Sequence, residues 1–179
     1  KVRVTARILY VIYAALTLVQ IILLILGGMP VFDSILNSFA TAGTGGFSMS
    51  NEGIAVYNSA YIDGVITVFM ILFGINFNLI YFFLIGKIAP VLKSEELRGY
   101  LAIIAGSTLL ITLNIASQYP SYLKAFRYAV FQVASIITTT GFTTTNYDKW
   151  PMFSQTILLL LMFIGACAGS TGGGIKVSR

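Results

Sequence analysis

Two short clusters of threonine and glycine hold the oxygen atoms of this chain that are best suited to bind a cation. The first is Thr44-Gly45-Gly46-Phe47 and the second is Thr139-Thr140-Gly141-Phe142. Backbone carbonyls and threonine hydroxyls are hard oxygen ligands, and rings of carbonyls replace the hydration shell of an ion in a selectivity filter. The glycines at 46 and 141 permit backbone angles that a side chain would forbid. We therefore predict that both clusters are ion-binding loops.

The clusters belong to an internal repeat. A shift of 95 positions superposes three pairs: Thr44 with Thr139, Gly46 with Gly141, and Phe47 with Phe142. Each cluster follows a short amphipathic segment, residues 30–41 and residues 122–136, that is too short to span a bilayer. The C-terminal end of a helix carries partial negative charge, which favours a cation just beyond it. We expect two pore helices, leading into filter loops at residues 42–48 and 138–143.

The composition indicates a chain surrounded by lipid. Of its 179 residues 57% are hydrophobic and 9% are charged, whereas a soluble domain is near a quarter charged. The net charge of +5 lies at the ends of apolar segments and not in a stripe interleaved with aromatic residues, which argues against nucleic-acid binding. The absence of histidine largely excludes zinc sites and histidine chemistry, and no carboxylate is paired with a base or nucleophile. We expect a membrane protein with no covalent cofactor that is not an enzyme.

Four uncharged segments are long enough to cross a bilayer, which takes about 20 residues. They are residues 8–26, 64–85, 99–117 and 151–175. Eight of the 11 basic residues lie on one side of these spans, which we take as the cytoplasmic side. The expected fold is an all-α membrane protein with two repeats around a shared pore axis, each a membrane helix, pore helix, filter loop and membrane helix. The first repeat covers residues 1–86, a cytoplasmic linker residues 87–98, and the second repeat residues 99–179.

Polar and glycine residues inside two spans are candidates for gating. Gly74, Asn76 and Asn78 interrupt the second span, either as interhelical hydrogen-bonding groups or as a break beneath the filter. Near the end of the fourth span, Gly172, Gly173 and Gly174 each weaken a helix by about 1 kcal/mol relative to alanine. We interpret these three glycines as a flexible joint near the inner mouth of the pore.

Four acidic residues lie on the outer side of the predicted spans: Asp33, Glu52, Asp63 and Asp148. Together they could concentrate cations near the outer mouth of a pore. Ordinary solvated loop charges explain them nearly as well.

The two loops, together with the ending Gly169-Ser-Thr-Gly-Gly-Gly174-Ile-Lys176, resemble the Trk/Ktr/HKT superfamily of potassium transporters, most closely its bacterial TrkH/KtrB type. Members have four pore repeats, and the loops at Thr44 and Thr139 resemble the third and fourth filter loops. The resemblance implies potassium uptake across the inner (cytoplasmic) membrane, a homodimer and a cytosolic nucleotide-binding regulatory subunit. It also implies a gating segment in the second span. Of Lys176 and Arg179, which are otherwise cytoplasmic anchors, it favours Arg179 as a basic residue that faces the pore.

The chain has two repeats where the family has four. We expect it to be the C-terminal half of a longer protein, although two copies related by twofold symmetry could also close a pore. A membrane transporter for another substrate and a non-transporting assembly subunit stay open as alternatives. Potassium against sodium selectivity, and a channel against coupled transport, stay open as well.

Overall fold

The computed structural model describes residues 2–179, and every regular element within this range is a helix, which confirms the all-α prediction. Eight α-helices follow one another: α1 (Val2–Leu26), α2 (Val31–Ala42), α3 (Ala60–Phe73), α4 (Phe77–Leu84), α5 (Ile88–Lys93), α6 (Glu95–Ile115), α7 (Tyr122–Ile137) and α8 (Met152–Ile164). Short 3-10 helices occur at Gly53–Tyr57, Ala116–Gln118 and Tyr147–Lys149. Lys1, one of the basic residues expected before the first span, lies outside the described residues.

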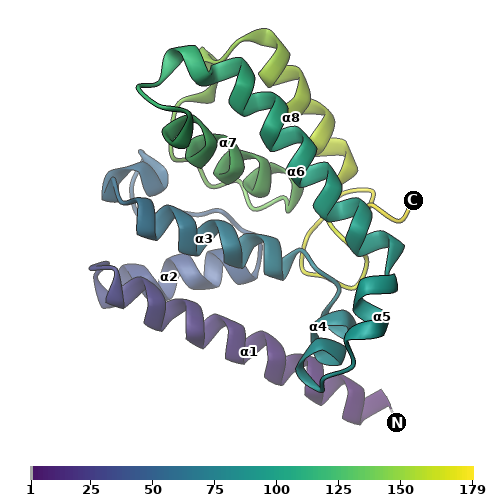
Figure 1. The fold of residues 1–179 in the computed structure, drawn as a ribbon. Helices are drawn as coiled ribbons and strands as arrows, with labels where there is room; N and C mark the ends of the chain where they lie inside the picture. Colours follow the sequence, from purple (N-terminus) through teal and green to yellow (C-terminus); the bar gives the residue numbers. More distant parts are fainter. Residues whose placement is uncertain (1) are drawn as a thin grey trace.

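The helices form two groups of the same design that pack side by side (Figure 1). In the first group the short helix α2 contacts both α1 and α3, and in the second the short helix α7 contacts both α6 and α8. The groups meet where α3 packs against α7. Each of α2 and α7, which the sequence predicts as pore helices, therefore packs between two other helices of its own group.

Serine side chains fix where three of the helices begin. Ser59, Ser94 and Ser121 each accept a hydrogen bond from the backbone N–H three residues later, at distances of 3.4, 3.3 and 3.2 Å. This is the usual N-cap arrangement, and it satisfies an N–H that the helix leaves unpaired. Because Ser94 caps α6, that helix begins at Glu95, four residues before the predicted third span. The predicted linker is therefore mostly helical, since α5 also lies within it.

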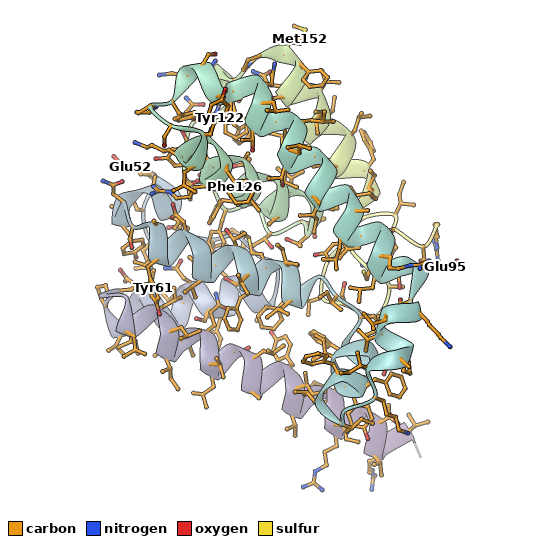
Figure 2. The ribbon with its side chains drawn as sticks, viewed as in Figure 1. Glu52, Tyr61, Glu95, Tyr122, Phe126 and Met152 are labelled. Atoms are coloured by element: carbon orange, nitrogen blue, oxygen red, sulfur yellow. The ribbon has the colours of Figure 1, made fainter. Side chains whose placement is uncertain are left out.

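Two helices are long and apolar enough to cross a membrane, Val2–Leu26 and Glu95–Gln118, where the second includes the 3-10 turn that follows α6. Both expose large apolar side chains, as Leu18 and Leu109 do, and a helix that is apolar around most of its surface suits lipid. Figure 2 shows Glu52, Tyr122 and Met152 toward one end of the molecule and Glu95 toward the other. This separation agrees with the predicted division into an outer and a cytoplasmic side.

The second predicted span, residues 64–85, is two helices and not one. α3 ends at Phe73, α4 begins at Phe77, and the two axes are bent by 102°. Asn76 is the N-cap of α4, because its side-chain oxygen accepts a hydrogen bond from the Asn78 N–H at 2.9 Å. Of the two interpretations of Gly74, Asn76 and Asn78, the structure therefore agrees with a break in the helix.

The prediction of one long fourth span, residues 151–175, is wrong. α8 ends at Ile164 and has 13 residues. Gly165 stops it, because its φ of 77° and ψ of −170° are accessible to glycine almost alone. The chain then folds back on itself, so that the Lys176 N–H donates to the Ile164 carbonyl at 2.9 Å and the Val177 N–H to the Ala166 carbonyl at 3.1 Å.

Asp63 is not a solvated loop residue, as the sequence suggested, but lies in the first turn of α3 with 3% of its surface exposed. One of its carboxylate oxygens is 3.1 Å from Nε of Arg127 on α7. The guanidinium also lies 4.9 Å from the centre of the Tyr128 ring, in cation–π contact. This ion pair joins the two repeats, and no periodicity in the sequence links residues on helices so far apart.

We expect the change Asp63→Asn to lower the free energy of unfolding of the intact protein by about 3 kcal/mol, because it leaves Arg127 without its counter-charge. The double change Asp63→Leu with Arg127→Met should recover most of that loss, since it removes both charges. Thermal unfolding in detergent measures the difference. Asp148→Asn, which removes an exposed carboxylate, is the matched control and should have little effect. Equal melting temperatures for Asp63→Asn and Asp148→Asn would contradict the role of the pair.

Candidate functional site

The junction between pore helix and loop has the same backbone hydrogen bonds in both repeats. After α2 the N–H groups of Gly43, Thr44 and Gly45 donate to the carbonyls of Phe39, Thr41 and Ala40 at 2.9, 3.2 and 2.7 Å. After α7 the N–H groups of Thr138, Thr139 and Thr140 donate to the carbonyls of Ala134, Ile136 and Ser135 at 3.1, 3.1 and 2.9 Å. Every donor and acceptor of one set is 95 positions from its counterpart. The sequence repeat is therefore a repeat of backbone geometry.

Both loops place a threonine in the left-handed region of backbone space. The φ angles are 51° at Thr44 and 60° at Thr139, and the glycines two residues later have φ of 67° and 89°. A β-branched residue in this region is uncommon and costs about 1–2 kcal/mol. Conformations of that kind persist where the surroundings impose them, often at functional sites. Because the same strained conformation occurs at equivalent positions of both loops, we infer that the loops are functional sites.

The structure brings the two loops into direct contact. A Cβ atom added to Gly46 would overlap the carbonyl of Thr140 and would lie 3.1 Å from the carbonyl carbon of Gly141. Just beyond, the Ile54 N–H donates to the Thr143 carbonyl at 3.0 Å. Gly46 and Gly141, central to the predicted filter, thus lie side by side. Gly46 must be glycine for this approach.

The two phenylalanines that the repeat pairs have different environments. Phe47 is 83% exposed, whereas Phe142 is 1% exposed and packs in a buried cluster with Phe131 of α7 and Met70 of α3. The Phe142 carbonyl accepts a hydrogen bond from the Ser135 hydroxyl at 2.6 Å. That carbonyl, which the sequence predicts as an ion ligand, therefore already accepts one hydrogen bond within its own repeat. Position 142 anchors the loop.

The carbonyls of Thr139, Thr140 and Gly141 accept no hydrogen bond from any residue between 2 and 179. The hydroxyls of Thr138, Thr139 and Thr140, in contrast, all have hydrogen-bond partners. Thr138 donates to the Ala134 carbonyl at 2.6 Å and lies 2.8 Å from the Thr140 hydroxyl. The oxygen atoms left available for a cation are thus backbone carbonyls, just past the C-terminal end of α7, where the helix dipole is negative.

The glycine-rich segment after α8 lies against both loops. The Gly173 N–H donates to the Thr139 hydroxyl at 2.7 Å, and the Thr44 hydroxyl donates to the Thr171 carbonyl at 3.3 Å. A Cβ atom at Gly172 would meet the Thr138 carbonyl oxygen at 3.2 Å. The two threonines with left-handed backbone are therefore both held by this segment.

The same segment also closes the break between α3 and α4. The N–H groups of Cys167 and Thr171 donate to the carbonyls of Gly74 and Phe73 at 3.1 and 3.3 Å, and the Phe77 N–H donates to the Gly169 carbonyl at 3.2 Å. The two predicted gating regions are thus one connected unit. Its partners lie far apart in sequence, so the pattern of either region alone does not reveal the connection.

Of the two basic residues near the end, Lys176 is the one that the structure places within this unit. Its amino group donates to the Gly172 carbonyl, and its backbone is left-handed with φ of 82°. Arg179 is exposed, and its backbone N–H donates to the Lys176 carbonyl at 3.1 Å. On the other side, the Glu96 carboxylate accepts from the Ala168 N–H at 2.6 Å. The sequence analysis did not single out Glu96, which it placed only within the predicted cytoplasmic linker at residues 87–98.

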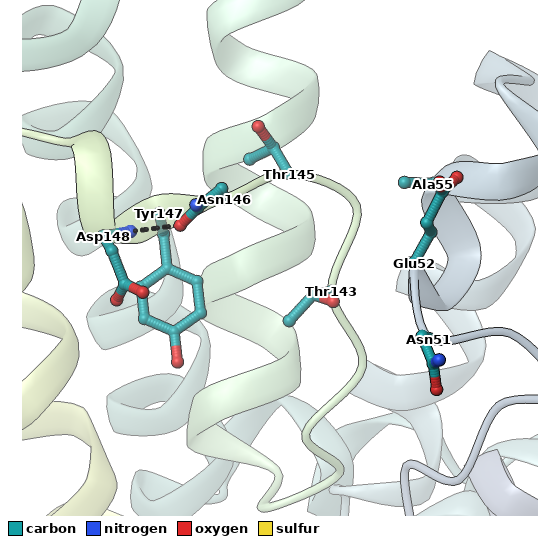
Figure 3. A pocket seen from close by; sticks show the side chains of 8 residues that line it. All are labelled: Asn51, Glu52, Ala55, Thr143, Thr145, Asn146, Tyr147 and Asp148. Carbon is teal, nitrogen blue, oxygen red and sulfur yellow. Dashed lines mark hydrogen bonds between the residues drawn. The ribbon is translucent and has the colours of Figure 1, made fainter.

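An open pocket of about 470 Å³ lies between the two segments that follow the loops. Figure 3 shows Glu52 on one side of it and Asp148 on the other, with Thr143 on the irregular segment between them. The Asp148 N–H donates to the side-chain oxygen of Asn146 at 3.1 Å. Two of the four outer carboxylates expected from the sequence therefore border this pocket.

A third outer carboxylate, that of Asp33, is used within the protein. It accepts a hydrogen bond from the Tyr57 hydroxyl at 2.7 Å. Burial, and after it this bond, raises the pKa of Tyr57 to about 12, so that the phenol stays protonated and donates. The bond links the first turn of α2 to the segment that follows the loop at residues 42–48, which we call loop three.

Comparison with known proteins places this geometry in a family. The TrkH family model, described as a cation transport protein, matches residues 1–179. The chain belongs to the TrkH family. It is 37% identical over 182 residues to the Trk system potassium uptake protein TrkH of Salmonella typhimurium, and 39% identical over 184 residues to that of Vibrio parahaemolyticus. Both alignments cover 100% of the chain.

A TrkH-family structure shares the whole fold. The crystal structure of the potassium transporter TrkH from Vibrio parahaemolyticus matches with a TM-score of 0.91 and 39% sequence identity, over 98% of this chain. The chain spans 38% of that protein and 38% of each of the two relatives. The resemblance inferred from the two loops is thus confirmed at the level of the family.

We call the loop at residues 138–143 loop four. We expect Thr139→Val to release the glycine-rich segment from loop four, because valine keeps the shape of threonine but removes the acceptor of the Gly173 N–H. A hydrogen bond of this kind contributes about 1 kcal/mol, so amide hydrogen exchange over residues 170–176 should rise about fivefold. Mass spectrometry of the intact protein in detergent measures it. Thr145→Val, which removes a hydroxyl beyond the loop, is the control. Unchanged exchange in Thr139→Val would contradict the contact.

Proposed function

We propose that the chain supplies two selectivity-filter loops of a potassium uptake protein in the inner (cytoplasmic) membrane. One observation carries the proposal: two loops with the same hydrogen bonds and the same left-handed residues follow the ends of two pore helices and touch at Gly46. The relatives named above are potassium uptake proteins, which supports potassium as the ion. The protein is then a transporter and carries out no covalent chemistry.

In this proposal the ligands are backbone carbonyls and not hydroxyls. The Thr139 hydroxyl is bonded to Gly173, and the Thr44 hydroxyl is bonded to Thr171. The carbonyls of residues 44–46 and 139–141 accept no hydrogen bond from the described residues, and they would replace water around a stripped potassium ion. The negative ends of α2 and α7 favour the cation at the same place. No proton transfer is needed.

Two loops surround only half of an ion. We propose that the other ligands come from two further repeats, so that the chain forms part of a four-repeat protein, in keeping with its 38% share of its relatives' length. The family resemblance further suggests a homodimer and a cytosolic nucleotide-binding regulatory subunit. The connected unit around Gly74, Gly172 and Lys176 is the proposed gate, since it is the part that touches both loops.

A transporter for an anionic or organic substrate is the second candidate, and the structure gives a reason to rank it lower. Such transporters aim helix N-termini at the substrate, whereas here the C-termini of α2 and α7 point to the candidate site. A buried charge, which that function would favour, does exist at Asp63. It is already compensated by Arg127, and it lies in the first turn of α3, far along the helix from the break.

The test is potassium uptake by cells that lack their own uptake systems, using the full-length protein that contains this chain. Gly46→Ser and Gly141→Ser should each reduce uptake or the preference for potassium over sodium. The strain of a left-handed serine, about 1–2 kcal/mol, corresponds to about tenfold. Gly46→Ser should be the more severe, because its Cβ also meets Thr140, whereas nothing lies within 4 Å of a Cβ at Gly141.

Gly64→Ser is the matched control, since Gly64 lies in α3 with an ordinary helical backbone and open space around it. It should transport as the unmodified protein does. If Gly46→Ser and Gly141→Ser reach the membrane in normal amounts and transport potassium normally, the filter assignment is wrong.

A further inference from the structure

Two carboxamides are buried inside the pore helices without enough partners. Gln132 of α7 is 1% exposed, and neither its nitrogen nor its oxygen has a hydrogen-bond partner among the described residues. Asn37 of α2 is also 1% exposed. Its oxygen has no partner, and its nitrogen has only the Met29 sulfur at 3.5 Å. Leaving such a group unpaired costs more than a bond contributes, so these two positions need an explanation.

The repeat that relates the two loops also relates these two residues, since Asn37 and Gln132 are 95 positions apart. A carboxamide therefore occupies the same turn of both pore helices. Ordinary core packing would select an apolar residue at this place. The coincidence points to a role connected with what the repeats share, which is the loop.

Gln132 lies one helical turn before Ser135 and so on nearly the same face of α7. Ser135 holds loop four through three hydrogen bonds: its carbonyl accepts from the Thr140 and Gly141 N–H groups, at 2.9 and 3.2 Å, and its hydroxyl donates to the Phe142 carbonyl at 2.6 Å. The side chain of Gln132 therefore lies on the side of the helix along which the chain leaves the filter.

The outgoing segment carries a matching unpaired group. Burial alternates along it, because Phe142 and Thr144 are buried while Thr143 and Thr145 line the outer pocket. Thr144 therefore points into the protein. It is 5% exposed, and its hydroxyl has no partner. Ser135 and Phe142 are hydrogen-bonded, so they give a common starting point. From Phe142 to Thr144 an extended chain advances about 6.6 Å, and from Ser135 back to Gln132 the helix rises about 4.5 Å. Gln132 and Thr144 therefore lie at similar heights along the axis of α7.

Asn37 faces the corresponding segment of the first repeat. Asn37 lies one helical turn after Asp33 and so on nearly the same face of α2, and Asp33 accepts a hydrogen bond from the Tyr57 hydroxyl at 2.7 Å. Tyr57 lies in the 3-10 helix that follows loop three. In both repeats this turn of the pore helix thus faces chain that has just left the filter.

We propose that the carboxamide of Gln132 binds a buried water molecule together with the Thr144 hydroxyl and so positions filter loop four, and that Asn37 has the equivalent role for loop three. A buried water typically makes about three hydrogen bonds to groups that are otherwise unpaired, and such a site needs two or more polar partners, which are present here. The inference rests on the proposed function of the loops and makes both residues positioning residues rather than ion ligands.

The test measures the KM and maximal rate of potassium and sodium uptake by the full-length protein. Gln132→Met keeps the length and volume of the side chain but removes its hydrogen bonds. We expect KM for potassium to rise and the preference over sodium to fall, each about five- to tenfold, with a smaller change in maximal rate. Asn37→Leu should act in the same direction. Thr112→Val, which removes another buried unpaired hydroxyl on α6, should change nothing.

Thr144→Val gives a second route to the same answer, because it is conservative and lies outside the helix. It should reproduce the effect of Gln132→Met, and the double variant should be no worse than either single one, since both remove the same bridge. Normal KM and ion preference in Thr144→Val and in Gln132→Met overturn the inference, and so do additive effects. If the unmodified protein takes up no potassium, the proposed function has failed and not this inference.

Discussion

Hydrogen bonding of the backbone at membrane depth is the constraint on which this structure depends. Lipid offers no partner to an N–H or a carbonyl, so irregular chain survives there only if the protein itself supplies the bonds. After α2 and α7 the first N–H groups of each loop bond back to the last carbonyls of the helix. The carbonyls of residues 44–46 and 139–141 are then left without a hydrogen-bond partner among the described residues. The rule that forbids loose chain in lipid therefore also produces a surface of unpaired oxygen.

The same constraint explains why two interrupted helices lie together. α3 stops at Phe73 and α8 stops at Ile164, and each stop exposes carbonyls that need donors. The chain after α8 supplies them, from Cys167 to Gly74 and from Thr171 to Phe73. The Phe77 N–H at the start of α4 in turn donates to the Gly169 carbonyl, so the two interruptions are hydrogen-bonded to each other. A movement that separates them must find new partners for these backbone groups.

The repeat, the two short helices α2 and α7 and the two loops that follow them could be predicted from the sequence, because each has a local signal: a 95-residue spacing, apolar residues at helical intervals, and glycine after threonine. The end of α8 could not, since an uncharged run of residues looks the same whether it is helical or folded back. The ion pair of Asp63 with Arg127 was also missed. From the sequence alone, a charged residue next to a membrane span is interpreted as exposed to solvent. Only the packing of α3 on α7 shows that Asp63 is buried.

The two loops are alike in backbone but not in how they are supported. Loop four has the Ser135 and Thr138 hydroxyls within its own repeat, whereas the equivalent positions in loop three are Ala40 and Gly43, which have no hydroxyl. Loop three is instead held from outside, through Thr44 to Thr171. Its Phe47 is exposed, while Phe142 is buried. Loop four is thus held by hydrogen bonds within its own repeat, whereas loop three is held by a neighbouring segment. The exposed ring of Phe47 then lies where a further repeat of the proposed pore would pack.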